Sequence, residues 1–166
     1  SSVRHCIVIW LPNGDSKQDS EHALWLKKLY GSRLYIGLQR LLKDGEVGYI
    51  KHCEQISEIF NLNIIACGGS LMHDKNRLPL QHTLQAIKKG ISVHHLGANS
   101  LPNSEYALRP ISTIIKLYPD QYIQNAIHVA NECTFSLSQL KYEYPSELIT
   151  KNKTPIQYLI ELVRHG

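Results

Sequence analysis

The chain has 166 residues, of which 43% are hydrophobic and 19% are charged. This length suits one domain of ordinary size, with or without a short tail, and the composition lies far from that of disordered chains. A large multi-domain assembly and a disordered chain are therefore excluded for this piece. The formal net charge of +4 does not by itself indicate nucleic-acid binding, because the footprint of a DNA-binding protein is a clustered basic stripe.

The sequence begins with Ser-Ser, and its only methionine is Met72, so we expect the chain to be part of a longer protein. No apolar run approaches the roughly 18–20 residues that span a bilayer, and the first ten residues lack the order of a signal peptide. These features predict a soluble, intracellular protein without a membrane partner.

Two hydrophobic patterns alternate in the first part of the chain. Short, nearly continuous apolar runs predict parallel strands covered on both faces, at residues 5–11, 33–38 and 63–67. Helical spacing of apolar residues predicts amphipathic helices between and after them, at residues 19–30, 46–60 and 79–89. The third helix places Leu80, Leu84 and Ile87 on one face and ends in Lys88-Lys89-Gly90, which suits a helix C-terminus.

This order predicts an α/β fold with right-handed crossovers and a parallel sheet. Three strands make a thin sheet with open edges, so we expect further strands outside this chain. Residues 91–110 are rich in Gly, Pro, Asn and His and predict an irregular connection. The chain beyond them reads as mainly helical.

Two helices are predicted in this last part. Residues 120–133 carry a broad apolar face and predict a helix that docks on another element. The second begins at Thr154-Pro155-Ile156-Gln157, a capping box with Pro at the first helical position, and directs Ile156, Leu159, Ile160 and Val163 inward.

The four cysteines, Cys6, Cys53, Cys67 and Cys133, are widely spaced and form no Cys-x-x-Cys pair. Three of them lie in apolar stretches, where a thiol packs as a small hydrophobic group. We therefore expect buried, reduced thiols rather than a disulfide or zinc framework.

Functional groups of parallel α/β folds gather at the carboxyl ends of strands, so residues 11–15, 39–43 and 68–74 are the segments to inspect. Arg40 suits a phosphate contact, but a solvated loop charge is the favoured interpretation. Gly68-Gly69 resembles a phosphate-cradling turn only loosely. His73 and Asp74 suit a metal or an acid–base pair, although adjacent side chains point in different directions and a surface pair is favoured.

Two further groups are weaker candidates. His94-His95 with His73 or His82 have a spacing that fits no standard metal site. A modest basic patch suits a nucleic-acid backbone, but helix capping and solvation explain it equally well; its members are Lys75, Arg77, Lys88 and Lys89. No Ser/His/Asp or Cys/His constellation can be assembled, so no catalytic, cofactor-binding or metal-binding residue is predicted.

The segment FSLSQLKYEYP at residues 135–145, followed by TPIQYL at 154–159, resembles the junction after the PHP (polymerase and histidinol phosphatase) domain of bacterial C-family DNA polymerases. It most resembles their error-prone branch, which is similar to the alpha subunit of DNA polymerase III. The Tyr-Glu-Tyr-Pro element is the specific part. Further matches at residues 34–40, 66–73, 84–87, 108–109 and 117–119 extend the resemblance over nearly the whole chain.

The resemblance implies that residues 1–108 are the C-terminal part of a PHP domain, which in the family is a distorted βα barrel. Residues 109–166 would be a helical connection and the start of the polymerase palm. The intact protein would be a DNA-directed DNA polymerase of damage-induced mutagenesis and translesion synthesis in the bacterial cytoplasm, with magnesium in its palm. Its implied partners are primer–template DNA, deoxynucleotides, the other polymerase domains, a sliding clamp and mutagenesis proteins.

The chain departs from the family at the metal site. Gly69 and Leu71 stand where metal-binding members carry an Asp-x-His pair, and only His73 survives from that stretch. Gly37-Leu38-Gln39 stands where related members read Glu-Leu-His. One imidazole cannot hold a divalent ion that needs several ligands, so we predict a degenerate site in a structural or docking part.

Two alternatives stay open. The first is a metal-dependent PHP phosphoesterase or 3'-5' proofreading exonuclease that is completed by an N-terminal half outside this chain. The second is a pure interaction module that docks through a sheet edge or an apolar helix face.

Overall fold

A computed structural model of the chain describes residues 5–140 and 153–165. The chain folds into two compact units, Ser1–Cys133 and Thr134–Gly166. The Tyr-Glu-Tyr-Pro element at residues 142–145 lies outside the described residues. The boundary expected between residues 108 and 109 separates domains of a family, and it stays a prediction because compactness alone does not identify those domains.

The first unit is built on a parallel sheet of three strands, β1 (Val8–Trp10), β2 (Leu34–Gln39) and β3 (Asn63–Cys67), in the order β1-β2-β3. The predicted α/β class and parallel sheet are confirmed; a barrel stays a prediction. Residues 34–38 of the central strand are all buried, and β3 buries Ile64 and Ile65 on opposite faces of the sheet, whereas β1 is only partly covered. β1 is shorter than expected, and its Ile9 is 46% exposed because β1 forms an edge of the sheet.

The helices α1 (Ser16–Tyr30) and α2 (Glu46–Phe60) follow β1 and β2. α1 begins three residues earlier than predicted, because the Asp15 carboxylate accepts hydrogen bonds from the N–H groups of Lys17 and Gln18 at 3.0 and 2.9 Å. Asn61 ends α2 in the left-handed conformation, with φ +46°. Both helices are therefore bounded by local backbone signals.

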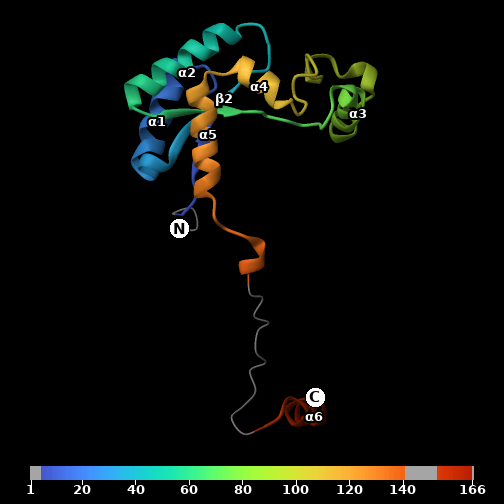
Figure 1. Ribbon diagram of the computed structural model, residues 1–166. Coiled ribbons are helices and arrows are strands. Elements are labelled where there is room, and N and C mark those ends of the chain that lie inside the picture. Colours follow the sequence, from blue (N-terminus) through green and yellow to red (C-terminus); the bar gives the residue numbers. More distant parts are fainter. Residues whose placement is uncertain (1–4, 141–152, 166) are drawn as a thin grey trace. The chain divides into compact units, whose positions relative to one another are not determined.

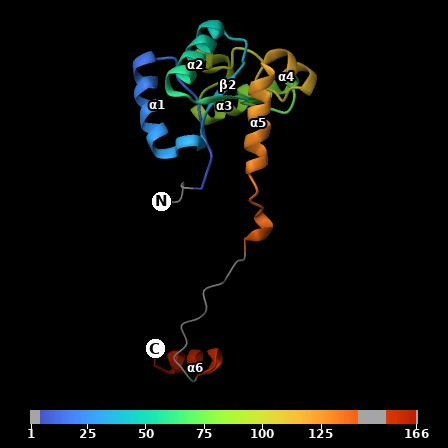
Figure 2. The ribbon, with the colours of Figure 1, turned by 60° about the vertical axis from the view of Figure 1, so that its left-hand side comes forward.

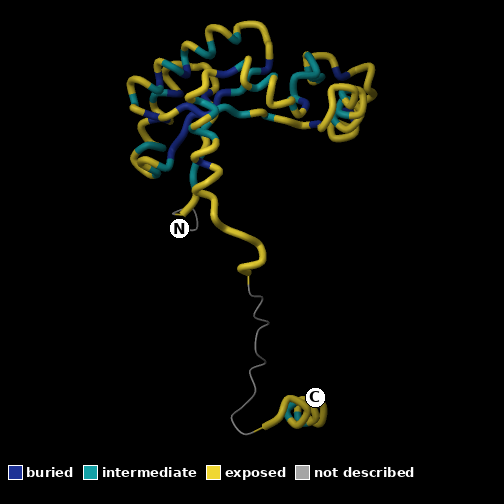
Figure 3. Tube along the Cα trace, viewed as in Figure 1, coloured by how far each residue is buried: buried dark blue, intermediate teal, exposed yellow. Residues whose placement is uncertain are grey.

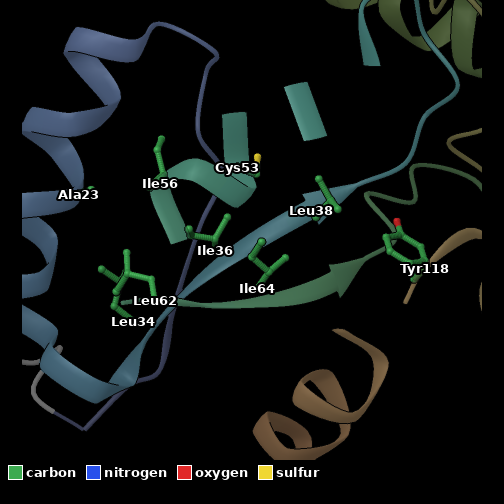
Figure 4. Close-up of a cluster of buried hydrophobic side chains, with 9 residues drawn as sticks. All are labelled: Ala23, Leu34, Ile36, Leu38, Cys53, Ile56, Leu62, Ile64 and Tyr118. Carbon is green, nitrogen blue, oxygen red and sulfur yellow. The ribbon is translucent and has the colours of Figure 1, made fainter. Parts of the chain in front are cut away.

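The main core lies between these two helices and one face of the sheet (Figure 4). Alternate residues of β2 point into it, and the other buried members come from α1, α2, β3 and their connections: Leu34, Ile36, Leu38, Ala23, Cys53, Ile56, Leu62, Ile64 and Tyr118. Each fully buried Ile or Leu contributes about 1.5–3 kcal/mol of transfer free energy. The period-two pattern of β2 therefore supplies the largest share of this core.

The helices α4 (Ile111–Leu117) and α5 (Asp120–Glu132) belong to the same unit as the sheet. The predicted docking helix is confirmed as α5, which runs beside the strands (Figures 1 and 2). Its Asn125 side chain donates a hydrogen bond to the carbonyl of Ile64 in β3 at 2.8 Å. Its Val129 packs with Tyr35 and Ile65 on the sheet face opposite the main core. A helix thus covers the outer edge of β3.

The helix α3 (Leu78–Lys89) lies beyond the carboxyl end of β3, apart from the other helices of the unit (Figure 1). Helical spacing places Leu80, Leu84 and Ile87 on one face of α3, and these side chains are 50%, 52% and 71% exposed. The helix instead buries Ala86 against neighbouring turns, and most of its surface is exposed (Figure 3). The amphipathic pattern was real, but no other element of the unit covers that face.

The irregular connection at residues 90–110 is confirmed, with short 3-10 turns at Val93–His95 and Gly97–Asn99. It also contains a pairing that periodicity did not indicate. Met72 and Ala107 form an isolated parallel bridge, and the N–H of Leu108 donates to the carbonyl of Met72 at 3.0 Å. This bridge ties the end of the connection to the segment that follows β3.

The second unit contains α6 (Pro155–His165). The predicted capping box is confirmed: the N–H of Gln157 donates to Thr154 Oγ1 at 3.3 Å, and the N–H of Thr154 donates to Gln157 Oε1 at 3.0 Å. The expected inward face is not buried in this unit. Its apolar side chains are 46–73% exposed, namely Ile156, Leu159, Ile160 and Val163.

All four cysteines are free thiols, as expected, but only Cys53 is buried. Cys67 is half-buried, and Cys6 and Cys133 are exposed, because they lie before β1 and after α5 where packing ends. Within residues 5–140 and 153–165, no helix combines the length and the apolar character needed to cross a membrane.

Gly37 in the middle of β2 is a site where any larger residue must displace its neighbours. A Cβ there would lie 2.8 Å from Cγ2 of Ile9 and from Cδ2 of Leu11. We predict that Gly37→Ala lowers the free energy of unfolding by about 1–3 kcal/mol through overpacking. Urea denaturation followed by circular dichroism measures this change.

Gly48→Ala is the matched control, because a Cβ at this position in α2 meets nothing within 4 Å. Replacing a helical glycine by alanine should raise the free energy of unfolding by about 0.5–1 kcal/mol. Similar effects of both substitutions would contradict the close approach at Gly37.

Candidate functional site

The carboxyl ends of β2 and β3 are joined by one buried hydroxyl group. The Tyr118 hydroxyl accepts a hydrogen bond from the N–H of Arg40 at 2.9 Å and donates one to the carbonyl of Cys67 at 2.8 Å. Tyr118 is only 6% exposed, and burial raises the pKa of its hydroxyl above the ordinary value. The hydroxyl therefore stays protonated and able to donate.

Arg40 is held entirely by contacts within the chain. Its Nε donates to Glu46 Oε2 at 3.0 Å, and its Nη1 donates to the carbonyl of Leu117 at 2.6 Å. Glu46 also accepts from the N–H of Leu42 at 2.7 Å. The prediction of a solvated loop charge is wrong, because the fold turns this guanidinium inward to link three connections at the sheet edge.

A second arginine extends the same group of contacts. Arg109, whose side chain is 5% exposed, donates from Nη2 to the carbonyl of Arg40 and to Glu105 Oε2 at 3.1 Å. Lys75 Nζ lies 2.5 Å from Glu105 Oε1, and this hydrogen bond, helped by the charge of Arg109, lowers the pKa of Glu105. We call Arg40, Glu46, Glu105, Arg109 and Tyr118 the carboxyl-edge network.

A buried histidine–carboxylate pair lies between α1 and α2, and the sequence analysis missed it. Asp19 is fully buried and accepts from the N–H groups of Asn13 and Gly14 at 3.1 and 2.8 Å. His52 Nε2 lies 2.8 Å from Asp19 Oδ2. The available signal was that Asp19 falls at helical spacing on the same stripe of α1 as buried Ala23.

This pair has the form of a base and its orienting carboxylate, but it has no activated nucleophile beside it. Burial raises the pKa of the neighbouring Cys53 thiol to about 11, so the sulfur stays protonated. Asp19 instead satisfies two backbone N–H groups at the end of the β1–α1 connection. The Asp19–His52 pair therefore links α1 and α2 to each other and to the β1–α1 connection.

A cavity of about 360 Å³ opens at the carboxyl ends of β1 and β2. Its lining side chains come from the β1–α1 and β2–α2 connections, from the end of β2 and from α2: Asn13, Gln39, Leu41, Lys43, Asp44, Glu46 and Tyr49. The Gln39 side chain lies over Gly69, where a Cβ would be 2.7 Å from Gln39 Nε2. Gly69 also has φ +61°, a conformation that favours glycine.

The remaining candidates are not brought together. Asp74 accepts from the N–H of Asn76 at 2.8 Å and caps a 3-10 turn, while His73 beside it is exposed. His94 and His95 are exposed, and His82 Nε2 lies 3.3 Å from the carbonyl of Leu101. In the part of the chain that the structure describes, no three His, Cys, Asp or Glu side chains are grouped to hold a metal ion.

No protein-family model matches the chain. It is 46% identical over 165 residues to a protein of Vibrio vulnificus named error-prone DNA polymerase, and 46% identical over 167 residues to one of Vibrio campbellii. A protein of the same name from Methylococcus capsulatus is 38% identical over 161 residues. These matches cover 97–99% of this chain but only 15–16% of each relative. The chain is thus homologous to one segment of these proteins.

We predict that Tyr118→Phe lowers the free energy of unfolding by about 1–3 kcal/mol, because it leaves a buried N–H and a buried carbonyl without their partner. Hydrogen exchange should also become faster at the amide of Arg40. Denaturant titration and amide exchange measure the two effects.

Tyr122→Phe serves as the control, since the hydroxyl of Tyr122 makes only a long contact of 3.4 Å to Glu54. An equal loss of stability in both variants, or unchanged exchange at Arg40, would show that the Tyr118 hydroxyl does not join the strand ends.

Proposed function

We propose that this chain works as a structural or docking part within a bacterial C-family DNA polymerase of the error-prone branch. The observation that carries the proposal is the 46% identity over 165 residues, which is 99% of the chain, to a protein named error-prone DNA polymerase. Because the chain spans about 16% of that relative, catalysis by the whole protein would depend on regions outside it.

We infer a PHP part at residues 1–108 and a connection with the start of the palm at 109–166, of which α4 and α5 pack in the same compact unit as the sheet. Parallel strands in the order β1-β2-β3, joined by helices, have the connectivity of a segment of a βα barrel. The exposed edge residue Ile9 is where a further strand would add cover. α6, with its exposed apolar face, would belong to the palm region.

We infer further that the PHP metal site is degenerate. Gly69 stands where metal-binding members carry the Asp of their Asp-x-His pair, and Gly37 stands where related error-prone members often read Glu. Both glycines lie against other side chains in this fold. Ile9, Leu11 and Cys67 occupy the space beside Gly37, and Gln39 occupies the space beside Gly69. An acidic side chain at either position would have to displace packed neighbours, so the geometry supports loss of phosphoester hydrolysis.

The charged groups of the carboxyl-edge network also support a structural role, because they already bind other groups of this chain. Both arginine side chains already donate to carbonyl or carboxylate oxygens of this chain. A catalytic arginine must instead present free donors to the reacting group. The proposed role is therefore to hold the strand ends and connections in place.

For the intact protein, the resemblance supports addition of deoxynucleotides to a primer on damaged template DNA in the bacterial cytoplasm. Its palm would hold magnesium ions, which stabilise the attacking and leaving oxygens of the transfer. Other polymerase domains, a sliding clamp and mutagenesis proteins stay predicted partners. We assign no catalytic, cofactor-binding or metal-binding residue to this chain.

The second candidate is a phosphoesterase or proofreading exonuclease completed by an N-terminal half. One observation favours it: a cavity of about 360 Å³ remains at the strand ends where the active site of such a fold lies. Against it, His73 is the single surviving ligand of its stretch and is exposed.

The proposed function is tested by a chimera in which this chain replaces the matching segment of the Vibrio vulnificus relative. We predict that the chimera extends a primer at a rate within about tenfold of the parent, because the docking surfaces are similar at 46% identity. A parent with the segment deleted is the control. A folded chimera without primer extension, beside an active parent, would contradict the proposal.

The degenerate site is tested by metal analysis of the purified chain after growth with zinc and manganese. We predict no stoichiometric metal, because a divalent ion needs several ligands at short distance. His73→Ala is the matched control and should have the same trace content. One tightly bound ion per chain that is lost in His73→Ala would overturn the inference.

A further inference from the structure

The net charge of the chain is concentrated in one segment. Residues 75–104, here called the α3 lobe, contain four Lys or Arg residues and no Asp or Glu. They therefore carry the whole formal charge of +4, and the rest of the chain is formally neutral. This is the clustered arrangement that binding to phosphates requires and that the overall composition does not reveal.

Three cations of the α3 lobe are exposed and available to a ligand. Arg77, Lys88 and Lys89 are exposed, and none of them forms an ion pair with a residue in the described ranges. Lys75 differs, because Glu105 at 2.5 Å neutralises it. The two lysines lie in the last turn of α3, close enough in sequence to act on one stretch of a polyanion.

The same lobe holds a cavity of about 180 Å³, lined by Leu71, Gln81, His82, Gln85, Asn99 and Leu101. It is smaller than typical small-molecule pockets of about 300–1,000 Å³, so it suits a single planar ring system. The side-chain amides of Gln81, Gln85 and Asn99 form no hydrogen bond with another described residue. Each amide offers both a donor and an acceptor, as the edge of an unpaired base requires.

The cavity and the cations lie along one side of the helix. Gln81, Gln85 and Lys89 follow one another at intervals of four residues on α3, which makes them neighbours about 5–6 Å apart, and Arg77 directly precedes the first residue of the helix. The two glutamines that line the cavity thus have one cation before them and one after them. This spacing lets a strand place phosphates at both ends while one base turns inward.

We propose that the α3 lobe binds single-stranded nucleic acid, with its phosphates on Arg77, Lys88 and Lys89 and one unpaired base in the amide-lined cavity. The proposal rests on the proposed function, because a polymerase template supplies single-stranded DNA. Recognition would be largely independent of sequence, since most of the contacts go to the backbone. The lobe contains no Phe, Tyr or Trp to stack a run of bases, and His82 is the one imidazole that lines the cavity, so only one base is seated.

The test measures binding of a fluorescein-labelled DNA single strand of about 12 nucleotides to the purified chain by fluorescence anisotropy at several salt concentrations. Three phosphate contacts predict a slope of about −2 in log affinity against log salt. Arg77→Ala/Lys88→Ala/Lys89→Ala should lower the affinity by about tenfold or more at low salt and flatten this slope.

Lys17→Ala/Lys28→Ala/Lys51→Ala is the matched control, because it removes the same charge from exposed positions on α1 and α2. We expect a change of less than about twofold in this variant. Equal losses in the two triple variants, or no binding by the unaltered chain at low salt, would overturn the proposal.

The cavity has its own test. Gln81→Ala/Gln85→Ala should weaken binding of the normal strand by about threefold to tenfold and leave binding of an abasic strand of equal length unchanged. Gln55→Ala/Gln121→Ala, on α2 and α5, is the control. An equal loss of affinity for normal and abasic strands would show that the cavity does not bind a base.

The main competing occupant is an acidic protein that covers the exposed side chains of Leu80, Leu84 and Ile87. If a poly-glutamate peptide of matched charge binds as tightly as the DNA strand, an acidic protein is the favoured ligand and the proposal of nucleic-acid binding is overturned. Failure of strand binding would leave primer extension by the chimera unaffected, so this inference and the proposed function fail separately.

Discussion

The hydroxyl of Tyr118 is the contact on which the arrangement at the strand ends depends. It bridges the N–H of Arg40, just after β2, and the carbonyl of Cys67, at the end of β3. Because Tyr118 comes from the connection between α4 and α5, the same group fixes those helices against the sheet. Arg40 and Arg109 then link this point to the neighbouring connections, and each polar contact is protected from water by the core below.

This network explains why the carboxyl edge, the usual place for ligands in parallel α/β folds, holds charges without an evident catalytic arrangement. Its guanidinium and carboxylate groups are engaged with each other or with backbone carbonyls. Gly37 and Gly69 at this edge lie against neighbouring side chains. Stability and positioning are therefore the roles that the geometry supports best at this edge.

The α3 lobe contrasts with this edge in its packing. It lies apart from the sheet, and the Met72–Ala107 bridge and the Lys75–Glu105 ion pair tie it to the rest of the unit. Its outward apolar side chains and unpaired cations make it the part of the first unit best suited to contact another molecule. The first unit thus combines a sheet edge whose charged groups are bound mostly to each other, with Arg109 Nε left without a hydrogen-bond partner among the described residues, and an exposed, basic lobe.

The sequence by itself determined the order of the strands and of α1, α2, α3, α5 and α6, the irregular connection and the capping box of α6, because hydrophobic periodicity and capping act over a few residues. The loss of metal ligands could also be proposed from the sequence, by comparing its residue types with those of the family that it resembles. Only the tertiary structure decided that Arg40 is held inward, that Asp19 meets His52 and that the apolar face of α3 stays exposed. Each outcome depends on which segments, many residues apart, meet in the fold, and no local pattern encodes that proximity.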